Sequence, residues 1–273
     1  MNFNFKFLVP GVFLSLAATA VAHAYIPPGQ FIIKNMASKR TGTHLIRLVS
    51  QVSGYDAGKP NGQRFKAVTV FNVLTHTMTS QALNDQGAEL FGVEKKGEAL
   101  PLAMTLLYDS NTREIVAALK RAEIPVHVEE NVPTASASSL PDRPVPEATA
   151  ADETTGLRRW QGSVAWVLGF SPTRKDGPQL WIEKDTFLPL RLIVGDQDIQ
   201  FAKYRYSQDL PYPRTTSLAD RAGIIQLQED TTEVKVNPKE KEAEHAPIAM
   251  GYTELGNSSP LKELIRKYYA GLR

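Results

Sequence analysis

The sequence predicts an α+β protein that is mainly an antiparallel β-sheet. Short runs rich in Val, Thr, Leu and aromatic residues succeed one another with turn-like segments between them, and strands joined in this way pair antiparallel. The clearest pair is QLWIEKDTFLPLRLIV, in which strands Gln179–Lys184 and Pro189–Val194 flank a polar turn at Asp185–Thr186. A few amphipathic stretches with helical spacing supply the α part.

The first 24 residues have the features of a secretory signal peptide. Lys6 precedes the apolar run Phe7–Val21, and the small-x-small sequence Ala22–Ala24 follows it. We therefore expect export, cleavage after Ala24 and one mature domain over residues 25–273. The alternative is an uncleaved membrane anchor, which the short apolar run and the cleavage motif disfavour.

The first half of the mature chain predicts a helix followed by strands. Pro28–Arg40 carries Phe31, Ile32 and Met36 on one side, and Gly42 follows as a stop signal. Three β-strands are expected after this helix: Leu45–Ser53, the long run Arg64–Thr79 and the short run Glu89–Val93. A turn at Gly54–Gly62 separates the first two.

The middle of the chain predicts two helices and then a loop. Leu100–Leu107 is apolar, and Asn111 can cap a second helix that runs to Ile124 with Glu114 in the capping-box position. The segment 131–156 is rich in Pro, Ala and Ser and has almost no large apolar residues. We interpret it as a flexible loop within one domain, because it cannot bury enough surface to order itself.

The last part of the chain predicts further strands and a terminal helix. Ser259 can cap a helix over residues 260–270 that has Pro260 at its first position and an apolar stripe ending at Tyr268. This helix is cationic on its polar side, so transient contact with an anionic membrane surface is an alternative to packing on the sheet. The expected strands are Gly162–Phe170, Gln179–Lys184, Pro189–Val194, Asp198–Tyr206, Ile224–Glu229 and Thr232–Val236.

Composition and motifs exclude several classes of function. The formal charge is +2, and it falls to +1 when Lys6 leaves with the signal peptide, so a nucleic-acid-binding surface is not indicated. The chain has no cysteine, which removes disulfides and thiolate-bound metals. Its histidines are scattered, and no G-x-S-x-G, P-loop or G-x-G-x-x-G motif occurs. The acidic pairs Glu129–Glu130 and Glu229–Asp230 are interpreted as solvated surface. We expect no enzyme activity, no metal and no cofactor.

The segment from Trp166 to Val194, WVLGFSPTRKDGPQLWIEKDTFLPLRLIV, followed by DIQFAKYRY, resembles the LolA/LolB-like periplasmic lipoprotein-carrier superfamily. The likeness covers roughly Leu157–Tyr206. It implies a strongly curved sheet or half-open β-barrel with helices covering the concave face. Members bind lipoprotein acyl chains or other apolar ligands between sheet and helices in the bacterial periplasm, and some relatives are sensory or scaffolding proteins. The first half lacks the tryptophan- and arginine-bearing strand pattern of the carriers.

Large apolar and aromatic side chains are the candidate ligand-binding residues, and ordinary core packing is the alternative for each of them. Alternation places Trp181 on the opposite face from Leu180 and Ile182, so the hairpin does not identify the concave face. By resemblance, Arg47 is a candidate that would anchor a lid by binding a backbone carbonyl, and exposure at the sheet is the alternative. The candidate lining residues are Phe65, Phe71, Trp166, Phe170, Trp181, Phe201, Tyr204 and Tyr206.

Two functions follow from these expectations. The first is a periplasmic, non-enzymatic carrier for a lipid-like ligand or a lipoprotein acyl chain, linked to the cell envelope and outer membrane. The second is a protein-interaction scaffold or envelope-stress sensor on the same fold, with its interior filled by its own side chains and an envelope protein as partner.

Overall fold

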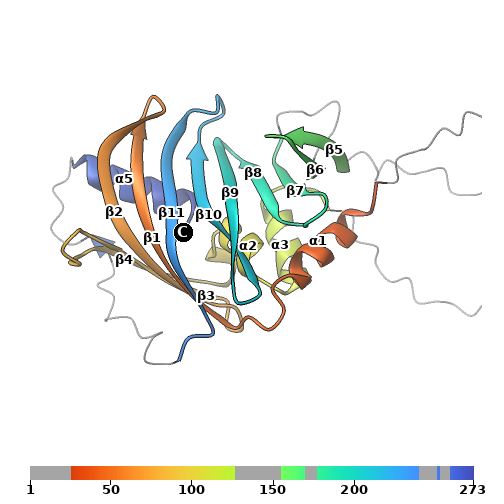
Figure 1. Cartoon of the computed structure of the whole chain (residues 1–273), viewed down its shortest axis with the longest axis horizontal. Coiled ribbons are helices and arrows are strands. Elements are labelled where there is room, and N and C mark those ends of the chain that lie inside the picture. The colour runs from red at the N-terminus through yellow and green to blue at the C-terminus, as the bar shows by residue number, and fades with distance from the viewer. Residues whose placement is uncertain (1–25, 127–154, 170–176, 240–250, 253–258) are drawn as a thin grey trace, which may run out of the picture.

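A computed structural model describes residues 26–126, 155–169, 177–239, 251–252 and 259–273, which form one twelve-stranded antiparallel sheet with four α-helices (Figure 1). The strand order is β12-β4-β3-β2-β1-β11-β10-β9-β8-β7-β6-β5, so β12 and β5 are the two edges and the sheet does not close on itself. The expected α+β antiparallel sheet is confirmed, whereas the described strands are not strongly curled into the expected half-open barrel. The strands are β1 (Leu45–Asp56), β2 (Lys59–Asn72), β3 (Thr77–Leu83), β4 (Glu89–Lys96), β5 (Thr155–Trp160), β6 (Ser163–Leu168), β7 (Gln179–Glu183), β8 (Pro189–Val194), β9 (Gln197–Ser207), β10 (Leu210–Ala219), β11 (Ile225–Val236) and β12 (Gly251–Tyr252).

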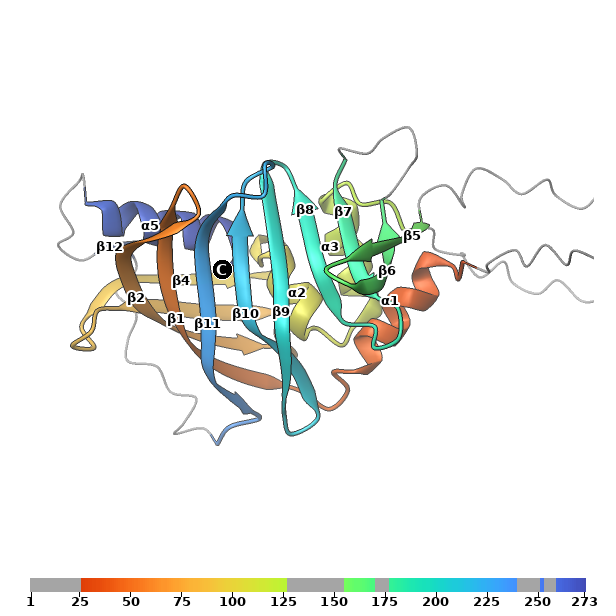
Figure 2. The same cartoon turned by 45° about the horizontal axis from the view of Figure 1, so that its top comes forward.

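The helices lie on one face of the sheet in two groups (Figures 1 and 2). One group contains α1 (Gly29–Ser38), α2 (Leu102–Tyr108) and α3 (Thr112–Arg121), in which α1 and α2 contact α3 and α2 contacts β8. We call this group the amino-terminal cover. The other is α5 (Pro260–Gly271), which contacts β2 and lies behind β2, β1 and β11. We call α5 the carboxy-terminal cover, and the face that both covers occupy the covered face.

Strand register shows which side chains of the central hairpin face the helices. Leu180 and Ile182 pair with Leu168 and Trp166 across β6 and β7, and all four belong to the buried core. Trp181 therefore lies on the outer face. The sequence left this orientation open, and the register resolves it.

The outer face near Trp181 carries an aromatic and charged cluster. Trp181 lies opposite Arg191, and its ring centroid is 6.0 Å from that of Trp160. The Arg191 guanidinium lies 4.1 Å from the Trp160 ring centroid and binds both carboxylate oxygens of Asp198 at 2.7 Å.

Gly169, which closes the strand Ser163–Leu168, is required by its surroundings. Its φ is +82°, and a Cβ at this position would lie 2.3 Å from the carbonyl oxygen of Pro178. Any other residue would place its Cβ against the Pro178 carbonyl, and it would also adopt a left-handed backbone conformation that is unfavourable for residues with a side chain. The sharp exit from β6 therefore depends on glycine.

The predicted helices beginning near Pro28, Pro101, Asn111 and Pro260 are present, and Asn111 accepts a hydrogen bond from the Arg113 amide as a cap. Ser259 makes no side-chain capping bond. The segment 131–156 lies outside the described residues except for its last two, which begin β5. The leader 1–24 is also outside them. None of the described helices has the length and apolar character to span a membrane.

Three strand expectations were wrong. The run Arg64–Thr79 is two strands, because the Asn72 side chain accepts the amides of Leu74 and Thr75 and forms a turn. The two strands expected over 224–236 are a single strand, β11, whose pairing with β1 shifts register between Val49 and Ser50. Most of the turn region 54–62 is strand, with only residues 57–58 between β1 and β2.

The strand β10 was not expected, because Pro211 and Pro213 lie inside it. It nevertheless pairs with β9 along much of its length and with β11 beyond the prolines. Proline removes a donor from the ladder, so here β9 and β11 override the local preference.

Candidate functional site

The covered face has an apolar floor that contains four of the predicted lining residues. Phe65, Phe71, Trp166 and Phe201 are buried and belong to one continuous core with residues of all four helices. Tyr204 packs against this core, and its hydroxyl donates to the Pro189 carbonyl at 2.6 Å. Sheet and helix side chains therefore belong to one buried core.

The structure does not bring the other predicted lining residues to this floor. Trp181 lies on the outer face, and Tyr206 is 64% exposed. Phe170 lies outside the described residues. Trp181 and Tyr206 were grouped with the others by residue type, whereas the covered face is defined by strand register.

A buried arginine joins the ends of two helices in the amino-terminal cover. Arg40 donates through Nε to the Leu107 carbonyl of α2 at 2.6 Å and through Nη1 to the Met36 carbonyl of α1 at 2.9 Å. Its side chain is only 1% exposed, and burial lowers the pKa of Arg40 to about 10. This arrangement holds a cation against neutral carbonyls, with aromatic hydroxyls and one carboxylate nearby.

Arg47, the residue expected to anchor a lid, is placed elsewhere. It is half-buried on β1 and pairs with Glu233 on β11 at 3.2 Å. The arginine that binds a carbonyl of a covering helix is Arg40. A signal for it was present, since Arg40 is the last residue of the predicted first helix and follows Met36 by one helical turn.

An acid and a histidine meet beside Arg40. Asp109 is buried after α2 and accepts the Asn111 amide at 2.7 Å, and its other oxygen is 3.3 Å from Nδ1 of His76. Burial raises the pKa of Asp109, and the His76 and Arg40 charges oppose this rise. No group of three or more potential metal ligands occurs within the described ranges.

The carboxy-terminal cover contains a buried ion pair. Glu229 on β11 and Arg273 after α5 are 1% and 3% exposed and bind each other directly. The Tyr268 hydroxyl donates to the same Glu229 oxygen at 3.1 Å. Lys95 on β4 donates to the carbonyls of Tyr269 and Arg273 at 3.1 and 2.6 Å. The Glu229 carboxylate on the sheet is thus paired with the Arg273 guanidinium, which follows α5.

The interpretation of Glu229–Asp230 as solvated surface was therefore wrong for Glu229. Asp230 accepts the Thr215 hydroxyl and the Gln228 amide at 2.9 and 2.8 Å on the outer face. Glu229 is paired with Val52 of β1 and Thr216 of β10 and points to the core. The error came from ending a strand at Glu229, where the structure has the middle of β11.

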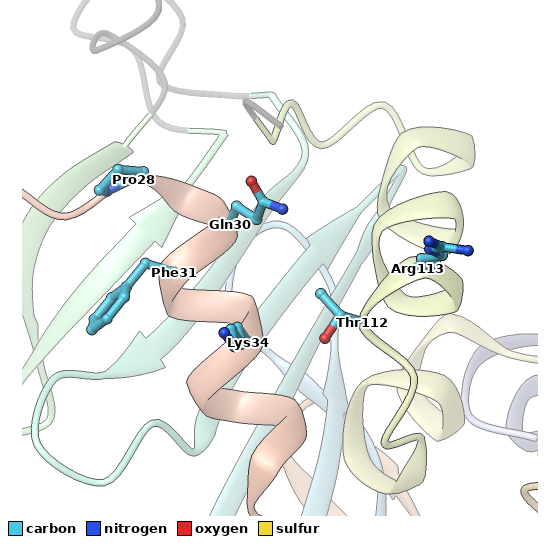
Figure 3. A pocket seen from close by; sticks show the side chains of 6 residues that line it. All are labelled: Pro28, Gln30, Phe31, Lys34, Thr112 and Arg113. Atoms are coloured by element: carbon cyan, nitrogen blue, oxygen red, sulfur yellow. The ribbon is translucent and has the colours of Figure 1, made fainter. Parts of the chain in front are cut away.

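A groove of 680 Å³ lies between α1 and α3 at the surface of the amino-terminal cover. The lining residues are Pro28, Gln30, Phe31 and Lys34 at α1 and Thr112 and Arg113 at α3. Figure 3 shows Gln30 and Thr112 in the space between the two helices. The Phe31 ring lies 6.3 Å from that of Phe187. No sequence motif indicated this groove. A second groove of 310 Å³ is lined by the β9–β10 turn and the end of β11.

No protein-family model matches this sequence, and no curated protein matches it. Solved structures do show similarity. A lipoprotein-sorting protein domain from Vibrio parahaemolyticus has a TM-score of 0.40 and 9% identity, covering 79% of this chain and 95% of that chain. The complex of MucA and MucB from Pseudomonas aeruginosa has a TM-score of 0.30 and 14% identity, covering 80% and 61%. A LolA superfamily protein from Nitrosomonas europaea has a TM-score of 0.43 and 8% identity, covering 80% and 97%.

Proposed function

We propose that this chain is a periplasmic, non-enzymatic carrier that binds the acyl chain of a lipid or lipoprotein between the sheet and the amino-terminal cover. The observation that carries the proposal is the Arg40 contact. An apolar sheet face is closed by short helices, and a single buried cation joins two of them through backbone carbonyls. Such a contact can break without leaving a carboxylate unpaired.

The energetics allow a ligand to replace the covering helices. Leu180, Ile182 and Leu192 form part of the floor under this cover. An acyl chain gains about 0.8 kcal/mol for each buried CH₂ group, so a long chain supplies about 10 kcal/mol before ordering costs. A hydrogen bond to a charged group contributes about 1.5–3 kcal/mol, so loss of both Arg40 bonds would cost about 3–6 kcal/mol, which is less than the acyl chain supplies.

In the proposed mechanism the helices part and the sheet keeps its shape. The acyl chain enters as Arg40 leaves the Leu107 carbonyl, and it then lies between the uncovered sheet face and the parted helices. Release to an envelope partner lets Arg40 bind the carbonyl again. The role in the cell is delivery of lipid or lipoprotein during outer-membrane biogenesis.

The test is whether the protein holds lipid. Protein purified from the periplasm is analysed by native mass spectrometry and by solvent extraction, and delipidated protein is titrated with a fluorescent palmitoyl probe. We expect bound lipid and saturable probe binding. Arg40→Met lowers the cost of opening and should bind the probe more tightly, whereas Arg47→Met, on the outer face, should bind it as the wild type does. Absence of lipid together with absence of probe binding would contradict the proposed carrier function.

One observation favours a second function on the same fold. The side chains between sheet and helices form a continuous core in this structure, as expected of an interaction scaffold or stress sensor whose interior is filled. A stoichiometric envelope protein recovered with the chain, with no lipid in either component, would support this function over the carrier.

A further inference from the structure

The ion pair beneath α5 is incompletely satisfied. Oε2 of Glu229 and Nε of Arg273 are buried without a hydrogen-bond partner among the described residues. A buried pair of this kind gains Coulomb energy but loses hydration, and its net contribution to stability is often small. Another cationic group could therefore replace Arg273 and also donate a hydrogen bond to Oε2 of Glu229.

The surroundings of Glu229 are aromatic and apolar. Phe65 of β2 meets the Tyr268 ring edge-on with centroids 5.3 Å apart, and Phe91 of β4 lies 4.6 Å from the Tyr269 ring. The Arg273 guanidinium is 5.5 Å from the centre of the Tyr268 ring. The sheet thus presents the Glu229 carboxylate beside aromatic rings, and α5 with the residues after it supplies two of these rings and a guanidinium. The Tyr269 hydroxyl also bonds Ser80 of β3 at 3.2 Å.

The outer side of α5 is polar and exposed to solvent. Glu263 and Arg266 are exposed and bind each other at 2.7 Å, while Leu264 and Ile265 on the opposite side are buried. Displacement of α5 would therefore expose its buried side, including Leu264 and Ile265, and a ligand would take the place of these side chains on the sheet.

We propose that the covered face beneath α5 is a binding site for a cationic amphiphile, meaning a molecule with an amine or guanidinium head and an apolar tail. Arg273 and the ring of Tyr268 occupy this site as an internal substitute. The ligand places its cation on Glu229 and its tail along Phe65 and its neighbours. This inference rests on the proposed function, because both require apolar ligands to enter the covered face, and it adds the ligand's charge and the position of its head.

The experiment replaces the internal cation and offers a matched external one. Full-length wild type and Arg273→Ala are titrated by calorimetry with dodecylguanidinium, dodecyl sulfate and a non-ionic dodecyl ether below their micelle concentrations. We expect the guanidinium probe to bind Arg273→Ala at least about tenfold more tightly than the wild type, a difference of about 1.4 kcal/mol, and to raise its melting temperature. The double variant Glu229→Gln/Arg273→Ala should lose this gain. Arg266→Ala, which removes an exposed arginine from the same helix, should behave as the wild type.

The outcomes separate this inference from the carrier itself. Equal gains for all three probes, or a gain that persists without the Glu229 carboxylate, would overturn the cationic site and leave the carrier standing. No probe binding to any variant would overturn both. If Arg273→Ala does not fold, Arg273→Met keeps the apolar stem and is titrated in its place. Hydrogen exchange of α5 in the wild type should also increase with the guanidinium probe and not with the sulfate.

Discussion

Each of the two covers of the sheet contains a buried arginine, and the two arginines lie in opposite electrostatic settings. In the amino-terminal cover, Arg40 is bound to uncharged carbonyls, and burial lowers its pKa to about 10. In the carboxy-terminal cover, burial acts to lower the pKa of Arg273, but the Glu229 carboxylate and nearby tyrosines raise it above its ordinary value. Opening the first cover returns one cation to water. Opening the second also leaves a carboxylate on the sheet. The second cover should therefore open only when another cation replaces Arg273.

Tyr108 connects these two settings. It is buried at the end of α2, and both Arg40 and Arg273 interact electrostatically with it. Burial raises the pKa of Tyr108, so the hydroxyl stays neutral between the two cations. A neutral hydroxyl adds no charge to either setting, so we expect the two covers to respond separately to substitution.

The largest effect is expected from Glu229→Ala. Removing the carboxylate leaves Arg273 as an uncompensated buried cation, which costs about 3–5 kcal/mol. Urea unfolding measures the loss, and hydrogen exchange should show it first in α5. Glu233→Ala is the matched control on the same strand, because Glu233 is 47% exposed in its pair with Arg47 and exposed pairs contribute about 0–1 kcal/mol. Equal losses for the two variants would contradict a special role for the buried pair.

Arg40→Leu should produce the next largest loss. It leaves the buried Leu107 carbonyl without its arginine donor, and a buried unsatisfied polar group costs about 1–3 kcal/mol. The change should increase hydrogen exchange in α1 and α2 while leaving α5 protected. Arg47→Leu serves as the control, since its partner Glu233 stays hydrated. Faster exchange in α5 than in α1 would show that the covers are not separate units.

Local patterns predicted the parts of this molecule that depend on neighbouring residues. The hairpin over 179–194 shows alternation in both strands and a polar turn between them, and α5 has a proline start and an apolar stripe. These features were confirmed because each can be recognised within one window of sequence. The outward position of Trp181 also followed from alternation, once the register showed which face the helices cover.

The polar contacts of the two covers could not be predicted in the same way. Arg40 and Leu107 are 67 residues apart, and Glu229 and Arg273 are 44 apart. A charged residue at the end of a helix or beside Asp230 is ordinarily solvated, and only the packing of a distant element made these two sites dry. The missing information was tertiary: which helix end lies over which strand.

A smaller effect should follow from Lys95→Met, which sharpens the view of α5 as a separately held cover. The Lys95 ammonium donates to the Tyr269 and Arg273 carbonyls, and burial lowers the pKa of Lys95. Losing these bonds should cost about 1–3 kcal/mol, less than loss of the ion pair, because methionine keeps the apolar stem. Hydrogen exchange over residues 268–273 measures it. Lys96→Met, an exposed neighbour paired with Glu94, should leave this exchange unchanged.

The smallest expected effect is a pH slope in the amino-terminal cover, tested with Asp109→Asn. Burial raises the pKa of Asp109 above the ordinary 3.8. A raised pKa means that this carboxyl's contribution to stability is fully present below pH 3.8 and is lost as pH rises through the folded-state pKa. The unfolding free energy of the wild type minus that of Asp109→Asn should therefore increase as pH falls from 7 towards 4.

Urea titrations across that range measure the slope. His76 Nδ1 lies 3.3 Å from the Asp109 carboxylate, so the series is repeated in a His76→Gln background to isolate the acid. Asp85→Asn, an exposed carboxylate paired with Arg64, tests whether loss of any acid produces the same slope. A slope of opposite sign in the His76→Gln background would show that the hydrogen bond from the Asn111 amide and the Arg40 charge together outweigh desolvation at Asp109. Asp109 would then stabilise the amino-terminal cover as a charged carboxylate, as Glu229 does in the carboxy-terminal cover.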